Sequence, residues 1–186
     1  MTSEHEHAHG HDHPPGEHDA ACEVAHGSAP VPATGRTLIA VFATPVAQYL
    51  LRYGADAGYT PVLVEPDAEL AEKASTDGFD VRPGIGSPDS GTDVVVTDHH
   101  REELGIMLRD ALATPARWVG IMGSPRAEPP HLQALAILGV APDEIARVHR
   151  PIGLNIGSKT PPEIAIATLA GLIADRNRRP GGFHFD

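Results

Sequence analysis

The residues best suited to ligand chemistry lie in two glycine-containing turns in the last third of the chain. The first turn follows an apolar run, precedes an amphipathic segment and contains Gly120, Gly123, Ser124 and Arg126. Backbone amides at the start of a helix, together with a hydroxyl and a guanidinium, can hold an anion at the edge of a parallel sheet. The sequence therefore predicts an anion-binding turn at this position.

The second turn begins at Pro151 and reads PIGLNIGSKTPPEIA. Its glycines free the backbone, its asparagine tolerates left-handed conformations, and its lysine offers a cation. The ligand candidates in this turn are Gly153, Asn155, Gly157, Lys159 and Thr160. Thr160 and Glu163 also have the spacing of a capping box, which predicts the start of a helix. We expect this turn to face the first one.

A third candidate site follows three consecutive valines, which indicate a strand buried on both faces. Asp98 and His99 come next. In a parallel sheet such residues lie at the ligand crevice, where they could serve in acid/base chemistry, in metal binding or in cofactor binding. Asp98 could equally cap the helix that follows. Both roles stay open.

Glu65 matches one part of the dinucleotide-binding fingerprint. It ends a strand about twenty positions past the turn that follows the first strand, where an acidic residue binds a ribose. However, the turn itself reads FATPVAQ, with no glycine between Phe42 and Tyr53. The sequence therefore disfavours NAD and NADP, and Glu65 has the alternative of being an ordinary charged residue at a strand end.

The elements that position these residues alternate between short apolar strands and helical patterns. Strands are expected at 37–43, 61–65, 79–82, 93–97 and 117–122. Helices are expected at 46–58, 68–76, 102–114, 129–138, 141–149 and 163–176. Arg147, His149 and Arg150 are expected at the end of the fifth helix as complements to its dipole. The pattern predicts a Rossmann-like, doubly wound parallel α/β sheet of five or six strands with helices on both faces.

One domain is expected over residues 37–180, followed by a frayed end at 181–186. Residues 1–36 lack hydrophobic periodicity and predict a disordered tail. Five histidines alternate along it and could bind one divalent Zn, Ni or Cu ion: His5, His7, His9, His11 and His13. A solvated tail, or in part a purification tag, is the alternative interpretation.

Charge and cysteine content narrow the class of protein. The net charge is -11 and the basic residues are scattered, which argues against nucleic-acid binding. No apolar stretch approaches the ~20 residues of a membrane span, and the acidic, histidine-rich start differs from a signal peptide. Cys22 is the single cysteine, so a reducing, cytoplasmic setting is expected.

The segments VGIMGSPR and PIGLNIGSKTPPEIA, with the apolar helix after them, resemble the Rossmann-type C-terminal domain of the XdhC/CoxI family of molybdenum hydroxylase accessory factors. The resemblance spans about residues 37–178. It implies a cytoplasmic protein without turnover of its own. Such a protein binds molybdenum cofactor (molybdopterin), assists its sulfuration or insertion, and docks on an apoenzyme of the xanthine or carbon monoxide dehydrogenase type.

The same resemblance implies further partners. These are a cysteine desulfurase or a separately encoded protein of the XdhC N-terminal type, and a homodimer is compatible with it. Relatives carry an additional N-terminal domain with a cysteine near its start, whereas Cys22 here lies in the histidine-rich segment. A sulfur-handling role is therefore not transferred to Cys22. Two other functions stay open, an NAD(P)-dependent oxidoreductase or nucleotide-binding protein, and a metal chaperone acting through the histidine tail.

Overall fold

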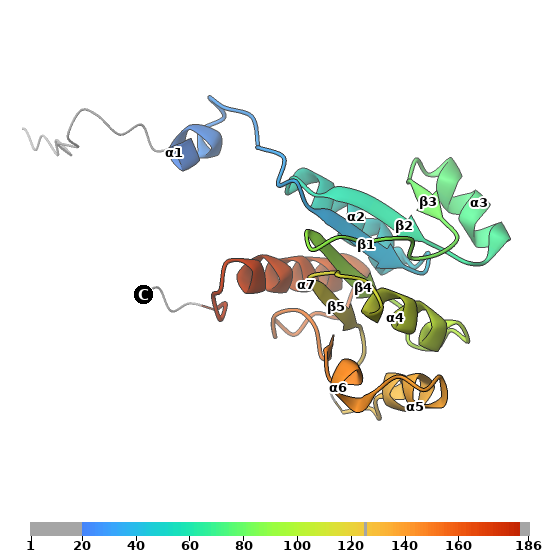
Figure 1. Ribbon diagram of the computed structural model, residues 1–186. Helices are drawn as coiled ribbons and strands as arrows, with labels where there is room; N and C mark the ends of the chain where they lie inside the picture. The colour runs from blue at the N-terminus through green and yellow to red at the C-terminus, as the bar shows by residue number, and fades with distance from the viewer. Residues whose placement is uncertain (1–19, 125, 183–186) are drawn as a thin grey trace, which may run out of the picture. The chain divides into compact units, whose positions relative to one another are not determined.

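The computed structural model describes residues 20–124 and 126–182 (Figure 1). The chain divides into two compact units, Met1–Pro32 and Ala33–Asp186. In the first unit, helix α1 spans Ala20–Ala25 and carries Cys22 as an exposed free thiol. The five histidines predicted to bind a metal ion lie outside the described residues.

The second unit is built on one parallel sheet. Its strands are β1 (Thr37–Val41), β2 (Thr60–Val64), β3 (Val81–Arg82), β4 (Thr92–Val96), β5 (Trp118–Ile121) and β6 (Val148–His149). They lie in the order β3-β2-β1-β4-β5-β6, and every neighbouring pair is parallel. This order reverses direction between β1 and β4, as in the doubly wound dinucleotide-binding fold. The predicted Rossmann-like sheet is confirmed.

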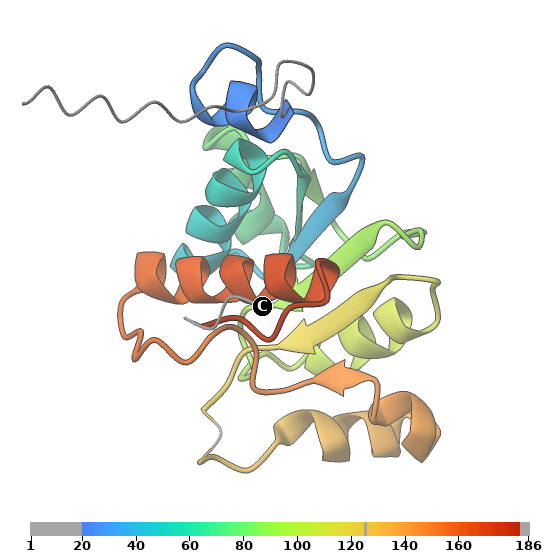
Figure 2. The ribbon, with the colours of Figure 1, turned by 90° about the vertical axis from the view of Figure 1, so that its left-hand side faces the viewer.

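Helices cover both faces of this sheet. They are α2 (Pro45–Asp56), α3 (Ala68–Thr76), α4 (Leu104–Leu112), α5 (Pro130–Ile137), α6 (Pro142–Ile145) and α7 (Pro161–Arg176). Helices α2 and α7 lie side by side on one face (Figure 2), and α4 packs against α5 on the other. Strand β1 contributes side chains to the hydrophobic cores on both faces of the sheet. Leu38 and Ala40 pack toward α2 and α7, while Ile39 and Val41 pack toward α4.

One predicted element is wrong in its second half. The expected helix over 141–149 ends at Ile145, and Val148 and His149 form β6 beside β5. His149 and Arg150 therefore do not complement a helix dipole. A strand of two residues has no periodicity to detect, and its pairing with β5 and the burial of Val148 override the local helical pattern.

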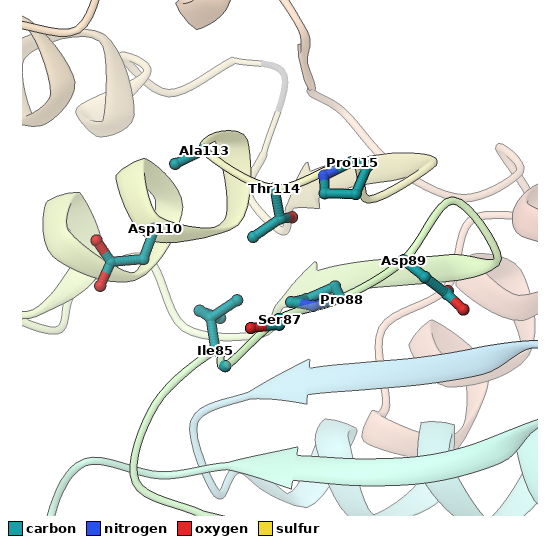
Figure 3. A pocket seen from close by; sticks show the side chains of 9 residues that line it. Ile85, Ser87, Pro88, Asp89, Asp110, Ala113, Thr114 and Pro115 are labelled. Atoms are coloured by element: carbon teal, nitrogen blue, oxygen red, sulfur yellow. The ribbon is translucent and has the colours of Figure 1, made fainter.

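Residues 83–91 connect β3 to β4 without a helix, and Ile85 anchors this crossover in the core. Between the crossover and the end of α4 lies an open groove of about 630 Å³ (Figure 3). Its lining includes Asp89 and Pro115, which precede β4 and β5. The groove is thus at the amino ends of these strands, away from the edge where parallel sheets bind ligands.

Candidate ligand-binding edge

The carboxyl ends of β1, β4 and β5 meet at one edge of the sheet. The ladder continues one residue beyond each strand: Thr97 N donates to Val41 O at 3.1 Å, and Met122 N donates to Val96 O at 2.9 Å. The loops that begin at Ala43, Asp98 and Gly123 therefore leave the sheet together. The predicted sites at Glu65, at Asp98 and in the turn at Gly123 lie on or next to these loops.

The glycine-free first turn is closed by side-chain hydrogen bonds. Phe42 has a positive φ of 75° and is fully buried. The Thr97 hydroxyl lies within hydrogen-bond distance of Val41 O at 2.9 Å and Phe42 O at 3.1 Å. The Thr44 hydroxyl donates to the Thr97 hydroxyl at 2.9 Å. These contacts stabilise a positive φ, which residues other than glycine rarely adopt.

Glu65 follows β2 as predicted, but its carboxylate is already paired. The residue is 1% exposed, and Arg101 from the loop before α4 donates to both of its oxygens, at 3.3 and 3.0 Å. Arg101 also contacts Glu103 and lies over the Phe42 ring, 4.7 Å from its centroid. The hydrogen bonds to Glu103 and then to Glu65 raise the pKa of Arg101 despite its partial desolvation. Sequence reasoning missed Arg101, since an arginine two residues after His99 carries no motif.

Asp98 does not cap the helix that follows it, so this alternative is wrong. Its carboxylate accepts from His100 N at 2.9 Å, whereas α4 begins at Leu104 with Glu103 as its N-cap residue. The rings of His99 and His100 lie 4.0 Å apart. Desolvation, and then the charges of His100 and Arg150, lower the pKa of His99 against the opposing effect of Asp98. His99 is therefore neutral at pH 7.

The first glycine turn is braced by Arg150, which follows β6. Its guanidinium donates to Ser124 O at 2.8 Å and to Ala127 O at 3.1 Å. A Cβ on Gly123 would lie 2.9 Å from Arg150 Nε, so the glycine makes room for this side chain. Ser124 and Arg126 are exposed, and Arg126 N donates to the Ser124 hydroxyl at 3.2 Å. The turn thus presents a hydroxyl and two arginines.

Next to this turn lies a buried histidine that sequence reasoning did not select. His131, in the first turn of α5, is 5% exposed, and its Nδ1 atom has no hydrogen-bond partner. Desolvation and then the charge of Arg150 lower its pKa, so the imidazole is neutral at pH 7. Arg150 Nε is likewise buried and unpartnered. Unpaired buried polar groups are rare and costly, so each of them calls for an explanation such as a water, an ion or a ligand.

Gly120 lies within β5 and serves packing. A Cβ at this position would lie 2.2 Å from the Trp118 ring and 2.8 Å from the side chain of Ile152. The Trp118 ring in turn stacks on His149, with centroids 4.8 Å apart and planes at 9°. The glycine therefore lets the indole lie flat along the strand.

The second turn packs against α7. Gly153 has a φ of 83°, a Cβ on it would lie 2.9 Å from the backbone of Ala167, and Leu154 N donates to Ala167 O at 3.0 Å. Asn155, Gly157 and Lys159 are exposed. The predicted capping box is present, because Thr160 N donates to the Glu163 carboxylate at 3.0 Å and the reciprocal bond also forms. Among the described residues, it is Arg150 rather than Lys159 that contacts the first turn.

The sheet order and the glycine turns have counterparts in known proteins. Residues 38–172 match the XdhC Rossmann domain. This chain belongs to the XdhC Rossmann domain family. It is 36% identical over 126 residues to the uncharacterized protein YqeB of Escherichia coli (strain K12). The aligned region covers 66% of this chain and 22% of YqeB. Its fold also matches a solved structure described as a xanthine dehydrogenase from Bacillus halodurans.

That structural match has a TM-score of 0.62 and 23% identity, and it covers 77% of this chain and 45% of the other. The likeness supports the fold alone. This XdhC Rossmann domain thus spans less than half the length of both relatives.

This XdhC Rossmann domain gathers several polar side chains at the carboxyl edge of its sheet. Its ligand edge combines two arginines, a hydroxyl and two neutral imidazoles. Within residues 20–124 and 126–182, no group of three or more histidine, cysteine, aspartate or glutamate side chains is placed to hold a metal ion. In the same part of the chain, every helix is too short or too polar to cross a bilayer.

Proposed function

We propose that this domain is an accessory factor for a molybdenum hydroxylase of the xanthine or carbon monoxide dehydrogenase type, and that it binds molybdenum cofactor or helps insert it. Membership of the XdhC family is the first support. The observation that carries the proposal is the turn at Gly123, where Arg150 braces the backbone and His131 leaves a buried nitrogen unpaired.

The residues of this edge fit the groups that a phosphorylated pterin presents. Ser124, Arg126 and Arg150 supply a hydroxyl and two guanidiniums, which suit the phosphate. The neutral imidazoles of His99 and His131 each offer one donor and one acceptor, which suit the amide-like edge of a pterin ring. When bound, the cofactor supplies the redox chemistry of its client enzyme, and these side chains hold and orient it.

The remaining predicted residues belong to the same proposal in a different role. Gly120 makes room for Trp118 within β5, and Gly153 and Gly157 take positive φ in the second turn, whereas Asn155, Lys159 and Thr160 form an exposed second rim. Asp98 orients the histidine pair through the His100 amide. We expect Lys159 to contribute only after a ligand or a partner covers this rim.

The partners follow from the same proposal. The client is a molybdenum hydroxylase apoenzyme, with a cysteine desulfurase or a separately encoded XdhC N-terminal-type protein as a further component. We place the process in the cytoplasm, where the exposed Cys22 thiol stays reduced. Use of NAD(P) is disfavoured because Glu65 is already paired.

Retention of the cofactor during gel filtration tests this proposal. Purified protein mixed with molybdenum cofactor should carry pterin fluorescence through the column. Arg150→Ala should lose most of that retention, and Arg126→Ala should lose part of it. The control is Arg109→Ala, which removes an exposed arginine that pairs with Asp110 on α4, away from the turn. Absence of co-elution with the unaltered protein at micromolar concentration would refute the proposal.

A further inference from the structure

The β1–β2 half of the ligand edge is the nucleoside half of a dinucleotide-binding fold. There, an acidic residue after β2 accepts the hydroxyls of a ribose, and amides of the first turn and of the following helix hold the pyrophosphate. In this protein the acidic residue is present as Glu65 and the helix is present as α2. Each of these groups already has a partner within the chain.

The acceptor capacity of Glu65 is filled. An ionised carboxylate offers about four lone-pair sites. Ala43 N and Asp67 N donate to the two oxygens at 2.8 and 3.0 Å, and the two terminal nitrogens of Arg101 donate at 3.3 and 3.0 Å. A ribose diol would therefore find no free acceptor on this carboxylate.

Two of the backbone donors around the start of α2 are also used. Pro45, the first residue of the helix, has no N–H group. Ala47 N donates to the Thr44 hydroxyl at 3.1 Å, and Ala43 N is bound to Glu65. A pyrophosphate at this turn would have to displace two of these bonds, and the turn has no glycine to let it approach the backbone.

Arg101 is the one member of this arrangement that comes from outside the β1–β2 half. It leaves the loop after β4, crosses the Phe42 ring, and reaches Glu65 with its side chain 21% exposed. Its guanidinium presents two parallel N–H groups to the carboxylate, which is the hydrogen-bond pattern of a vicinal diol. Removing this side chain would free two acceptor sites on Glu65 and leave the other two bonds in place.

We propose that Arg101 is a specificity-determining residue whose guanidinium occupies the ribose subsite, so that the β1–β2 half excludes nucleosides and any ligand is confined to the turn at Gly123. The latent subsite takes a ribonucleoside, recognised through its 2′,3′-diol. This inference goes beyond the proposed function and stands without it, because it concerns Glu65 and Arg101 alone.

Adenosine is the probe that tests the subsite, since it carries the diol and lacks the phosphates that the first turn rejects. Binding is measured by isothermal titration calorimetry with adenosine and with 2′,3′-dideoxyadenosine. The unaltered protein should bind neither at millimolar concentration. Arg101→Ala should bind adenosine, and should bind the dideoxy analogue about a hundredfold more weakly, because the analogue lacks both hydroxyls and each lost hydrogen bond weakens binding about tenfold.

Two control variants separate the subsite from a general loosening of the edge. Glu103→Gln removes the outer partner of Arg101 but leaves the pair with Glu65, so it should bind no adenosine. Combining Glu65→Ala with Arg101→Ala removes the acceptor, so this double variant should also bind none. Adenosine binding by the double variant as tight as by Arg101→Ala would overturn the proposal.

Arg101→Lys covers the case in which Arg101→Ala does not fold. Lysine keeps a charge opposite Glu65 and cannot pair with both oxygens in parallel, so adenosine binding should be detectable but weaker than in Arg101→Ala. Circular dichroism establishes that each variant is folded. The proposal is overturned if the unaltered protein binds adenosine as tightly as Arg101→Ala does. It is equally overturned if no folded Arg101 variant binds adenosine.

Discussion

The two halves of the ligand edge differ in how completely the chain satisfies its own polar groups. In the β1–β2 half, Glu65 has four N–H partners and the start of α2 is capped by Thr44. In the β4–β5 half, His131 Nδ1 and Arg150 Nε are buried without partners. A parallel sheet positions both halves alike, so the fold does not decide which of them can take a ligand. The side chains that reach in from the loops decide it.

Unpaired buried groups also occur at the opposite edge of the sheet, where Asp93, Arg36 and Arg117 form an ion cluster. There the Asp93 carboxylate has a strong partner in Arg117 Nε at 2.7 Å, and Arg117 also pairs with Asp175, so that two arginines face two carboxylates. The turn at Gly123 instead brings a cation close to neutral imidazoles. The comparison therefore predicts that the β1–β2 half serves stability and that the β4–β5 half serves binding.

Arg101→Ala should have the largest effect, and it tests whether the β1–β2 half serves stability. It leaves the Glu65 carboxylate buried without its cation, and the loss of one partner of a buried pair costs about 3–5 kcal/mol. We expect a loss of unfolding free energy in this range by urea denaturation. Glu103→Gln, at the partly exposed end of the network, should cost less than about 1 kcal/mol. Equal losses for the two variants would contradict a stabilising role specific to Glu65.

Two glycine substitutions compare the first glycine turn, at Gly123, with the second, at Gly153. Gly153→Ala forces a Cβ onto the Ala167 backbone at a positive φ, and should cost about 2–3 kcal/mol of unfolding free energy. Gly123→Ala meets only the movable end of Arg150, and should cost about 1 kcal/mol while lowering cofactor retention. Both are measured by urea denaturation, with gel filtration for the cofactor. A more costly substitution at Gly123 would show that its turn is a packing element.

The neutral histidines predict a loss of stability in mild acid. The pKa of His131 is lowered from 6.5 in the folded protein, so the unfolded chain takes up a proton first as the pH falls. The contribution of His131 to the unfolding free energy is complete above about pH 6.5. It is lost progressively as the pH falls toward the pKa of His131 in the folded protein. His99 and His149 act in the same direction.

Urea midpoints measured between about pH 7.5 and pH 5 check this. His131→Gln should flatten the decline, because the group that must stay neutral is removed. His26→Gln, at an exposed histidine outside the sheet domain, is the control. An unchanged pH profile in His131→Gln would mean that folding does not lower the pKa of His131.

The fold was largely predictable because its signals are local or periodic. The apolar run after Arg36, the three consecutive valines and the capping box at Thr160 indicated β1, β4 and the start of α7. Continuous apolar runs identify strands that are buried on both faces, and the helical period identifies the longer helices. Strand β6 was missed because its two residues are defined only by pairing with β5.

The site was less predictable because its geometry depends on long-range contacts. Gly123 and Ser124 were selected from a local turn, but Arg150, which braces them, lies 26 residues away from Ser124. Likewise Arg101 reaches Glu65 across 36 residues. Neither arginine belongs to a motif, and only the arrangement of β1, β4 and β5 brings them to the edge.

Removing residues 1–30 should have the smallest effect on the folded domain and the clearest effect on metal binding. The hydrogen bonds that join the chain to the sheet begin with Thr34 N, which donates to Gly58 O at 2.8 Å. The truncated protein should therefore keep its unfolding free energy within about 0.5 kcal/mol.

The described residues place no group of three or more metal-binding side chains together, so affinity for Ni or Zn should be lost with the histidines at positions 5 to 13. Isothermal titration of both proteins measures this loss. Unchanged affinity in the truncated protein would assign the metal to the folded domain, with His99, His100 and His131 as the first residues to substitute.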